Sequence, residues 1–564
     1  MVNFIKNIKK GIKPFVKDDN AKYVFLSIMA GSISFFWIFS FQFLTNKTGF
    51  FYFADHLFDL TGYKALMNSD WSLPVTKVDN IFPGKDFSII LLNYMPGYLI
   101  PLKIFKSISG IYFINPFPFW YFLCFVLNSI FSGKILQLFK LRNPVIYIIS
   151  IILIITNPLI INRMVFHVAL AAHWLIIGTI YYYFKAEKEN PTYFIKLSLF
   201  AAFSLYIHPY IAFMTSLIFI FLCLKLFFTN EKKVAIKGSL AYLVIVFSYF
   251  LLIFSPLDYL GNSDNYRGRW SAEFNSFFCS KYPINLINER FWCYEPFINY
   301  DHEGYAYLGL GIIIALIYFL FIPLKTIKIF RAYLPLFLSS LLLLIISFGN
   351  HWKIVHRQIF EFDYPIIFKQ IIELFRANGR FSWVFYYCVY FFLIISLSKL
   401  NRNIAILIFL FVSIFQFTDL NNIYSKYEKV YFNQMEKPEK LISLSNQLIN
   451  IENGVLHILP DERCFHKENF GYVDDPLVFA IHYLDKGGKL YSTRIGRYSG
   501  GFGDREFCNN YSIENEINEK KPGHFVIMDL NMLKDSIYIS KYNCKNIDPF
   551  LNKKYNPAYC EYDE

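Results

Sequence analysis

The chain has 564 residues, of which 55% are hydrophobic, 20% aromatic and 17% charged, and its mean hydropathy is +0.35. Soluble domains carry about 25% charged residues, so this composition excludes a soluble globular protein. The 65 Phe and 42 Tyr residues also exclude a disordered chain. The net charge of +13 fits either nucleic-acid binding or a membrane protein with basic cytoplasmic loops.

The apolar runs predict a mainly α-helical, polytopic membrane protein. The first run, 24–44, follows a lysine-rich segment and lacks the small-residue cleavage site of a signal peptide, so we expect a first span with the N-terminus inside. Ten further runs approach the length of a membrane span, which gives about eleven spans in all. They lie at 112–133, 144–161, 165–184, 193–208, 210–228, 237–256, 305–323, 332–348, 381–398 and 403–418.

The segment 87–106 decides the topology. It is apolar enough to cross the membrane, but Pro96 and Pro101 make it a poor lipid-exposed helix. If it crossed, the later basic clusters would fall outside, against the positive-inside bias. We therefore expect an interfacial helix on the outer face and a C-terminus outside the bacterial inner membrane. This topology explains the positive charge by inner loops and gives no support to a nucleic-acid partner.

The topology divides the chain into three parts. A basic cytoplasmic segment, 1–22, precedes a membrane domain, 23–420, whose outer loops lie at 45–111, 257–304 and 349–380. The remainder, 421–564, has short strand-like runs at 454–459, 524–530 and 536–540, with the helix-like DPLVFAIHYLDKG between the first two. We expect a small extracytoplasmic α/β cap there.

The cysteines agree with this sidedness. Three of the nine lie in predicted spans, and the other six lie outside, where disulfides form. Cys279 and Cys293 are the predicted local pair. The last four leave three connectivities open, and they are Cys464, Cys508, Cys544 and Cys560.

Ionisable residues gather at the outer ends of the predicted spans, where they are costly unless functional or in contact with lipid headgroups. Asp55, followed by His56, falls near the outer interface and could act as a general base. Arg163, with His167 four residues later on one helical face, could bind an anionic phosphate.

Arg376 and Arg380 precede the tenth predicted span on the outer side and could clamp a phosphate, with Gly379 allowing close backbone approach. Glu303 could supply a carboxylate to the site. His208, at a break between two short predicted spans, is a further candidate substrate-binding residue. No cofactor is expected, and no ligand spacing supports a divalent cation.

The residue order resembles the GT-C membrane glycosyltransferases. Asp55 in the first outer loop is followed by YKALMNSDWSLP at 63–74 and then by the interfacial segment 87–106. Four segments are also similar to a bacterial family of uncharacterised GT-C-like proteins known as a domain of unknown function: NRMVFHVALAAHW, IHPYIAF, HEGYAYLGLG and FRANGRFSWVFYY. This similarity covers about 25–420. The chain departs from the GT-C pattern at His56, where many relatives have a second acidic residue, and at Asn93, where relatives tend to have Asp.

The resemblance implies sugar transfer, with inversion, from a polyprenyl-phosphate donor to an extracytoplasmic glycan, glycolipid or protein. Asp55 matches the position of the catalytic carboxylate, and Arg163, Arg376 and Arg380 would neutralise the leaving lipid phosphate. Membrane lipid, the lipid-linked sugar and the acceptor would be its partners. Two alternatives stay open, namely a non-catalytic protein that binds lipid-linked glycans during envelope assembly, and a lipid-linked sugar flippase.

Overall fold

A computed structural model describes most of the helical part of the chain and scattered elements towards its end. The described residues are 19–45, 49–52, 55–81, 87–89, 95–254, 271–279, 302–320, 333–354, 357–363, 375, 377–427, 455–459, 475–490, 524–527, 542–546 and 558–562. The chain forms two compact units, which are described separately. The first contains Met1–Thr45, Pro116–Val246 and Ser263–Glu428, and the second contains Asn46–Asn115, Phe247–Asn262 and Lys429–Glu564.

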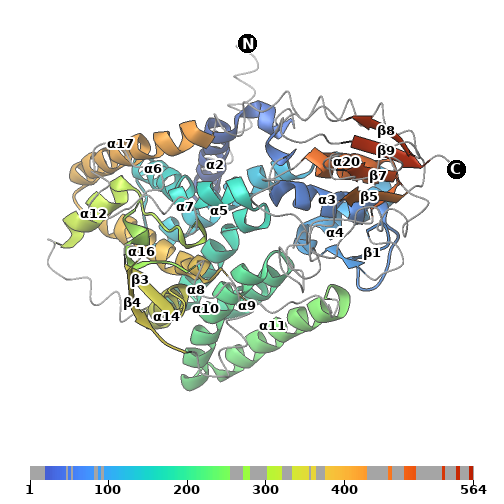
Figure 1. Ribbon diagram of the computed structural model, residues 1–564. Coiled ribbons are helices and arrows are strands. Elements are labelled where there is room, and N and C mark those ends of the chain that lie inside the picture. The colour runs from blue at the N-terminus through green and yellow to red at the C-terminus, as the bar shows by residue number, and fades with distance from the viewer. Residues whose placement is uncertain are drawn as a thin grey trace, which may run out of the picture. The chain divides into compact units, whose positions relative to one another are not determined.

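The first unit is built from helices (Figure 1). Those before residue 209 are α2 (Asp19–Leu44), α5 (Phe117–Leu138), α6 (Pro144–Ile155), α7 (Pro158–Phe166), α8 (Trp174–Lys188) and α9 (Tyr193–Phe203). The later ones are α10 (Pro209–Phe228), α11 (Lys232–Leu252), α12 (Leu310–Leu320), α14 (Leu334–Ser347), α16 (Trp383–Leu397) and α17 (Arg402–Tyr427), with α11 continuing into the second unit.

Within the described residues, six helices are long and apolar enough to cross a membrane, which confirms the predicted helical membrane protein. They are Asn20–Leu44, Phe117–Leu138, Pro209–Phe228, Lys232–Leu252, Asn378–Leu397 and Arg402–Asn421. The eleven predicted spans are not confirmed. Three of the predicted runs form shorter apolar helices, at Tyr193–Tyr206, Leu310–Phe319 and Leu334–Ser347.

The predicted span 144–161 is a bent pair, α6 and α7, with an angle of 44° between its helices. Two Asn-Pro pairs explain the geometry. Asn143 caps α6 by accepting from the backbone N–H of Val145, and Asn157 caps α7 by accepting from that of Ile160. A proline at the first helical position has no N–H to satisfy, so each Asn-Pro pair begins a new helix.

Helices α2 and α5 pack closely through small residues. A Cβ added at Gly133 would lie 2.2 Å from the Ser27 Oγ and 2.2 Å from the Tyr147 Oη. These two hydroxyls are hydrogen-bonded at 2.8 Å, and the Ser129 hydroxyl donates to the Ser27 carbonyl. Close approach through Gly and Ser with hydroxyl bonding is the usual way in which helices associate where no hydrophobic effect drives them together.

A carboxylate of α17 begins α12. Asp419 Oδ2 accepts from the Leu310 N–H at 2.9 Å and from the Tyr307 hydroxyl at 2.7 Å, while Gln416 Oε1 accepts from the Ile312 N–H at 3.2 Å. The first N–H groups of a helix have no partner within it, so side chains from α17 take that place.

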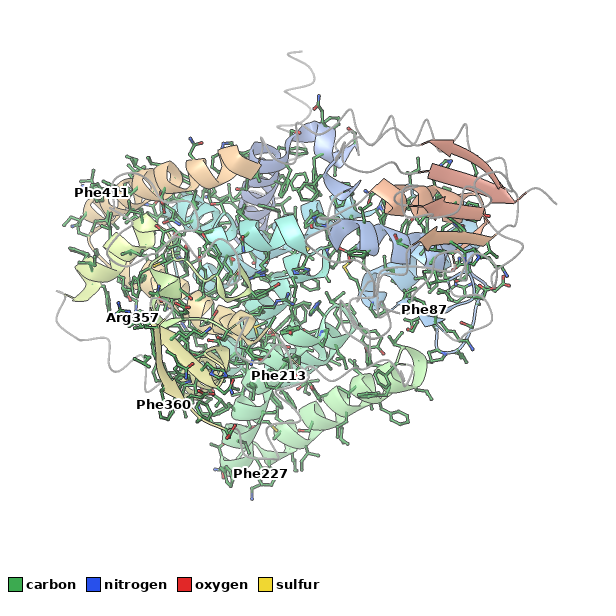
Figure 2. All side chains as sticks on the ribbon, in the orientation of Figure 1. Phe87, Phe213, Phe227, Arg357, Phe360 and Phe411 are labelled. Carbon is green, nitrogen blue, oxygen red and sulfur yellow. The ribbon has the colours of Figure 1, made fainter. Side chains whose placement is uncertain are left out.

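Several helices of the first unit carry large exposed apolar side chains, as membrane helices do. Figure 2 labels Phe227 of α10 and Phe411 of α17, which are 45% and 49% exposed. An antiparallel hairpin, β3 (His351–Ile354) and β4 (Arg357–Glu361), follows α14 and bears the labelled Arg357 and Phe360.

The second unit contains α3 (Asp55–Asn68), α4 (Pro96–Ser109), a short pair of strands, β1 (Lys77–Val78) and β2 (Phe87–Ser88), and a later sheet with α20 (Asp475–Asp485). The predicted interfacial segment 87–106 is helical from Pro96 onward, and Gly110, in the left-handed conformation, caps the C-terminus of α4. With 14 residues, α4 is shorter than a membrane span.

Lysines of α4 cover the end of α3. Lys106 Nζ donates to the Met67 carbonyl at 2.7 Å, and Lys103 Nζ donates to the Asp70 carbonyl at 3.0 Å. On the other side, Lys64 Nζ lies 2.8 Å from the Asp485 carboxylate at the end of α20. Cations therefore stabilise the negative end of α3.

The later sheet has the strand order β6-β5-β7-β9-β8. Strands β5 (Val455–Leu459), β6 (Lys489–Leu490) and β7 (His524–Ile527) are parallel, and β9 (Ala558–Tyr562) pairs antiparallel with β7 and with β8 (Tyr542–Asn546). Two of the predicted strand segments contain β5 and β7, and α20 lies in the predicted helical stretch. The predicted strand 536–540 lies outside the described residues.

Candidate functional site

Glu303 joins two buried arginines in the first unit. Arg380 approaches its carboxylate with two nitrogens, Nε at 2.6 Å from Oε2 and Nη2 at 2.7 Å from Oε1. Arg163 donates from Nη1 to Oε2 at 2.6 Å and from Nη2 to the Glu303 carbonyl at 2.9 Å. The fork of each guanidinium thus makes two directed bonds, which fixes both side chains.

His167 completes this cluster. Its Nε2 lies 3.2 Å from Glu303 Oε1 and 3.1 Å from Arg380 Nη2. The imidazole is 26% exposed, whereas the two arginines and Glu303 are buried, so His167 is the member most open to the surroundings. Arg163 and His167 both contact Glu303, but α7 ends at Phe166 and His167 is in the extended conformation, so the two residues do not share one helical face. Their predicted role in binding a phosphate stays a prediction.

Aromatic rings surround the two guanidinium groups. Arg380 Cζ lies 4.6 Å from the centroid of the Tyr210 ring, and Arg163 Cζ lies 5.5 Å from that of Trp383. His173 stacks on Trp383 with 4.6 Å between ring centroids, and its Nδ1 is 2.8 Å from the Tyr387 hydroxyl. Guanidinium groups are held well against aromatic faces, so these rings restrict the arginines further.

The backbone explains how distant segments converge here. Glu303 lies in a 3-10 turn, His302–Gly304, and Arg380 lies in another, Asn378–Ser382, just before α16. A Cβ at Gly379 would lie 2.4 Å from the Gly304 Cα. The close approach predicted for Gly379 is therefore an approach to the backbone beside Glu303, and only glycine fits there.

The electrostatics of the cluster favour an ionised Glu303. Burial by itself raises the pKa of this carboxyl, but Arg380, Arg163 and the hydrogen bond to His167 hold the pKa well below its ordinary value. The described ion pairs of the cluster thus join two guanidinium groups to one carboxylate.

His208 has a structural role in the described residues. Its Nδ1 accepts from the Tyr210 N–H at 3.2 Å and so caps α10, whose Tyr210 ring supports Arg380. Its predicted part in substrate binding stays a prediction. The predicted partner of Arg380, Arg376, lies outside the described residues.

The two predicted catalytic residues belong to the second unit. Asp55 is the first residue of α3, and its side chain lies outside the description. His56 is buried, with its ring centroid 4.7 Å from that of Phe50 and its Nδ1 3.9 Å from Asp59 Oδ2. Their roles stay predictions.

The disulfide predictions also stay predictions. Cys279 is described, but Cys293, Cys464 and Cys508 lie outside the described residues. In the register of β8 and β9, Cys544 is opposite Cys560, and their side chains lie outside the description. Cys124, Cys223 and Cys388 are free thiols. Within the described residues, no group of three or more His, Cys, Asp or Glu side chains could hold a metal ion.

Three aromatic contributors were not predicted from the sequence, namely Trp383, Tyr210 and Tyr387. Their only sequence signal is proximity to a predicted residue, since Trp383 follows Arg380 closely and Tyr210 follows His208. Aromatic residues make up a fifth of the chain, so a ring that supports an arginine does not stand out from one that faces lipid.

The apolar helices define the class of protein, a helical membrane protein, and the buried Arg–Glu–Arg cluster is its candidate site. The chain belongs to the family described as "Domain of unknown function (DUF6311)", whose model matches residues 28–421. No curated protein matches the chain.

Proposed function

We propose that this protein is an integral membrane glycosyltransferase of the GT-C type. It would transfer a sugar from a polyprenyl-phosphate donor to an extracytoplasmic glycan, glycolipid or protein, in the bacterial inner membrane. The eleven-span topology with the N-terminus inside and the C-terminus outside belongs to this proposal. The resemblance of the sequence to GT-C enzymes suggests the reaction.

One structural observation supports the proposal above the others. The cluster of Arg163, Arg380, Glu303 and His167 places two guanidinium groups and an imidazole around one carboxylate, with both arginines buried, and is formed by segments at the ends of apolar helices. A lipid phosphate combines one negative charge with an apolar chain. The guanidinium groups fit the phosphate, and the apolar helices fit the chain.

In the proposed reaction, an acceptor hydroxyl attacks the anomeric carbon of the donor sugar. The new carbon–oxygen bond forms as the bond between that carbon and the lipid phosphate breaks, and the configuration inverts. The Asp55 carboxylate takes the hydroxyl proton, and the phosphate leaves with the bonding electrons. Arg380 and Arg163 stabilise the charge that develops on the leaving phosphate, while Glu303 holds their guanidinium groups in place.

The test replaces the base and the phosphate site separately, in cells that lack the native copy. Asp55→Asn is expected to abolish glycan transfer and to raise the pool of lipid-linked sugar. Asp79→Asn is the control, because Asp79 lies in the same predicted outer loop, outside the segment 63–74, and is exposed. The readouts are surface glycans and lipid-linked intermediates, measured at equal protein abundance in the membrane.

One observation favours the non-catalytic alternative. Glu303 already accepts from both Nε and Nη2 of Arg380, and the catalytic reaction would need this guanidinium to stabilise the leaving phosphate. If Asp55→Asn leaves the glycans unchanged while Arg380→Gln removes them, the protein binds a lipid-linked glycan without catalysing transfer. Unchanged glycans in both variants would contradict both functions.

A further inference from the structure

Three lysines lie at the ends of α5, α8 and α9 that are remote from the Arg–Glu–Arg cluster. Helix α8 begins beside His173, which stacks on Trp383, and Lys185 lies eleven residues further on, about 17 Å away along the helix axis. Helix α8 contacts both α5 and α9, which lie beside it in Figure 1. Lys134 comes from α5 and Lys196 from α9.

The lysines surround two tyrosine rings. Lys185 Nζ donates to the Tyr181 hydroxyl at 3.2 Å and lies 4.4 Å from the centroid of the Tyr193 ring. Lys134 Nζ lies 5.7 Å from the Tyr181 centroid, and Lys196 Nζ lies 5.3 Å from the Tyr193 centroid. Because the Tyr181 oxygen accepts from Lys185, its own O–H is free to donate to a bound anion.

The three ammonium groups carry more charge than their surroundings neutralise. Lys134 is close enough to Lys185 and Lys196 to be repelled by both. Glu189 lies 3.4 Å from Lys185, and its side chain is 46% exposed. Within the described part of the chain, neither Lys134 nor Lys196 forms an ion pair with a carboxylate, so the four side chains sum to +3 − 1 = +2.

Helix α9 continues from this charge into an exposed apolar face. Leu199 and Phe203 follow Lys196 at three and seven residues, so all three share one side of the helix. Leu199 is 40% exposed and Phe203 is 36% exposed. A cation at one end of an apolar stripe matches a molecule with an anionic head and a hydrocarbon chain.

We propose that Lys134, Lys185 and Lys196 bind the phosphate of an anionic phospholipid whose acyl chain lies along Leu199 and Phe203. Basic pockets between membrane helices recognise such headgroups, and the positive-inside expectation puts this end of the helices on the cytoplasmic side. Inorganic phosphate has the anionic chemistry of the headgroup, but it has no acyl chain that could contact Leu199 and Phe203. The site does not depend on the proposed glycosyl transfer.

The experiment measures lipid binding to the delipidated full-length protein in detergent by native mass spectrometry. The probes are phosphatidylglycerol, phosphatidylcholine and inorganic phosphate. In the variant Lys134→Gln/Lys185→Gln/Lys196→Gln, affinity for phosphatidylglycerol is expected to fall about fivefold for each lysine removed. The matched control, Lys77→Gln/Lys486→Gln/Lys489→Gln, removes equal charge from the second unit, which contains none of the three helices of the site, and should leave affinity within about twofold of the native protein.

Two further arms separate the lipid from its phosphate. Leu199→Ser/Phe203→Ser is expected to weaken phosphatidylglycerol binding without changing the binding of inorganic phosphate. Equal losses in the lysine variant and its control, equal binding of phosphatidylcholine, or no effect of the apolar substitutions would each overturn the proposal. If the triple variant does not fold, Lys196→Glu at the exposed member gives the same test with a reversed charge.

Discussion

The Glu303 carboxylate holds the Arg380 guanidinium at two points, with Nε 2.6 Å from Oε2 and Nη2 2.7 Å from Oε1. The same Oε2 also accepts from Arg163 Nη1 at 2.6 Å. One carboxylate therefore orients two buried cations. Loss of the carboxylate is expected to destabilise the protein more than loss of one arginine. Without the carboxylate, two guanidinium groups would lie close together without this counter-ion.

Glu303→Gln is expected to destabilise the protein by about 3–5 kcal/mol, since uncompensated buried charge is costly. Thermal unfolding of the purified protein in detergent measures this. Glu361→Gln is the control, because Glu361 is 55% exposed and pairs with His351 at 3.3 Å, so its loss should cost less than about 1 kcal/mol. Equal effects of the two substitutions would show that the Glu303 cluster does not contribute to stability in this way.

The depressed pKa of Glu303 predicts a dependence of stability on pH. The folded-state pKa lies well below the ordinary value of 4.5, so the stabilisation is fully present above about pH 4.5 and is lost as the pH falls towards the folded-state pKa. The difference in melting temperature between the native protein and Glu303→Gln should stay constant from pH 7 to 5 and shrink in more acidic buffer. A difference that grows on acidification contradicts this assignment.

Gly133→Ala should destabilise the α2–α5 pair by about 1–3 kcal/mol, because the new Cβ collides with the Ser27 and Tyr147 hydroxyl oxygens. The background Ser27→Ala/Tyr147→Phe lacks both oxygens and is the control. Thermal unfolding of the native protein, the Gly133→Ala variant, the background and the background with Gly133→Ala gives the coupling energy between the new Cβ and the two hydroxyl oxygens. The substitution should cost clearly less in that background, and an unchanged cost would show that the close contact does not limit packing.

Asp419→Ala should cost about 1–2 kcal/mol, because it removes the acceptor that caps α12 through the Leu310 N–H. Thr418→Ala is the control. It changes the adjacent residue of α17, which is exposed and donates its hydroxyl to the Ile414 carbonyl of its own helix. Melting temperatures of both variants check this, and similar values would rule out the cap as a source of stability.

The sequence alone determined the class of protein and several members of its site. Apolar runs identify membrane helices because lipid requires them, and Arg163, Arg380 and Glu303 stand out because charge is rare beside such runs. The number of membrane spans could not be predicted reliably from the sequence. Hydropathy does not distinguish a full span from a shorter helix such as Leu310–Phe319, or from a pair bent at Asn157-Pro158.

Only the tertiary structure decided which charges meet. Arg163 and Glu303 are 140 residues apart, and Glu303 and Arg380 are 77 apart, so no local spacing predicts their shared ion pairs. The lysines of α5, α8 and α9 illustrate the same limit. The sequence shows their positive charge, but only the structure shows that tyrosine rings lie between them. Composition determines that a chain enters a membrane, whereas the packing of its helices determines where the buried charges find their partners.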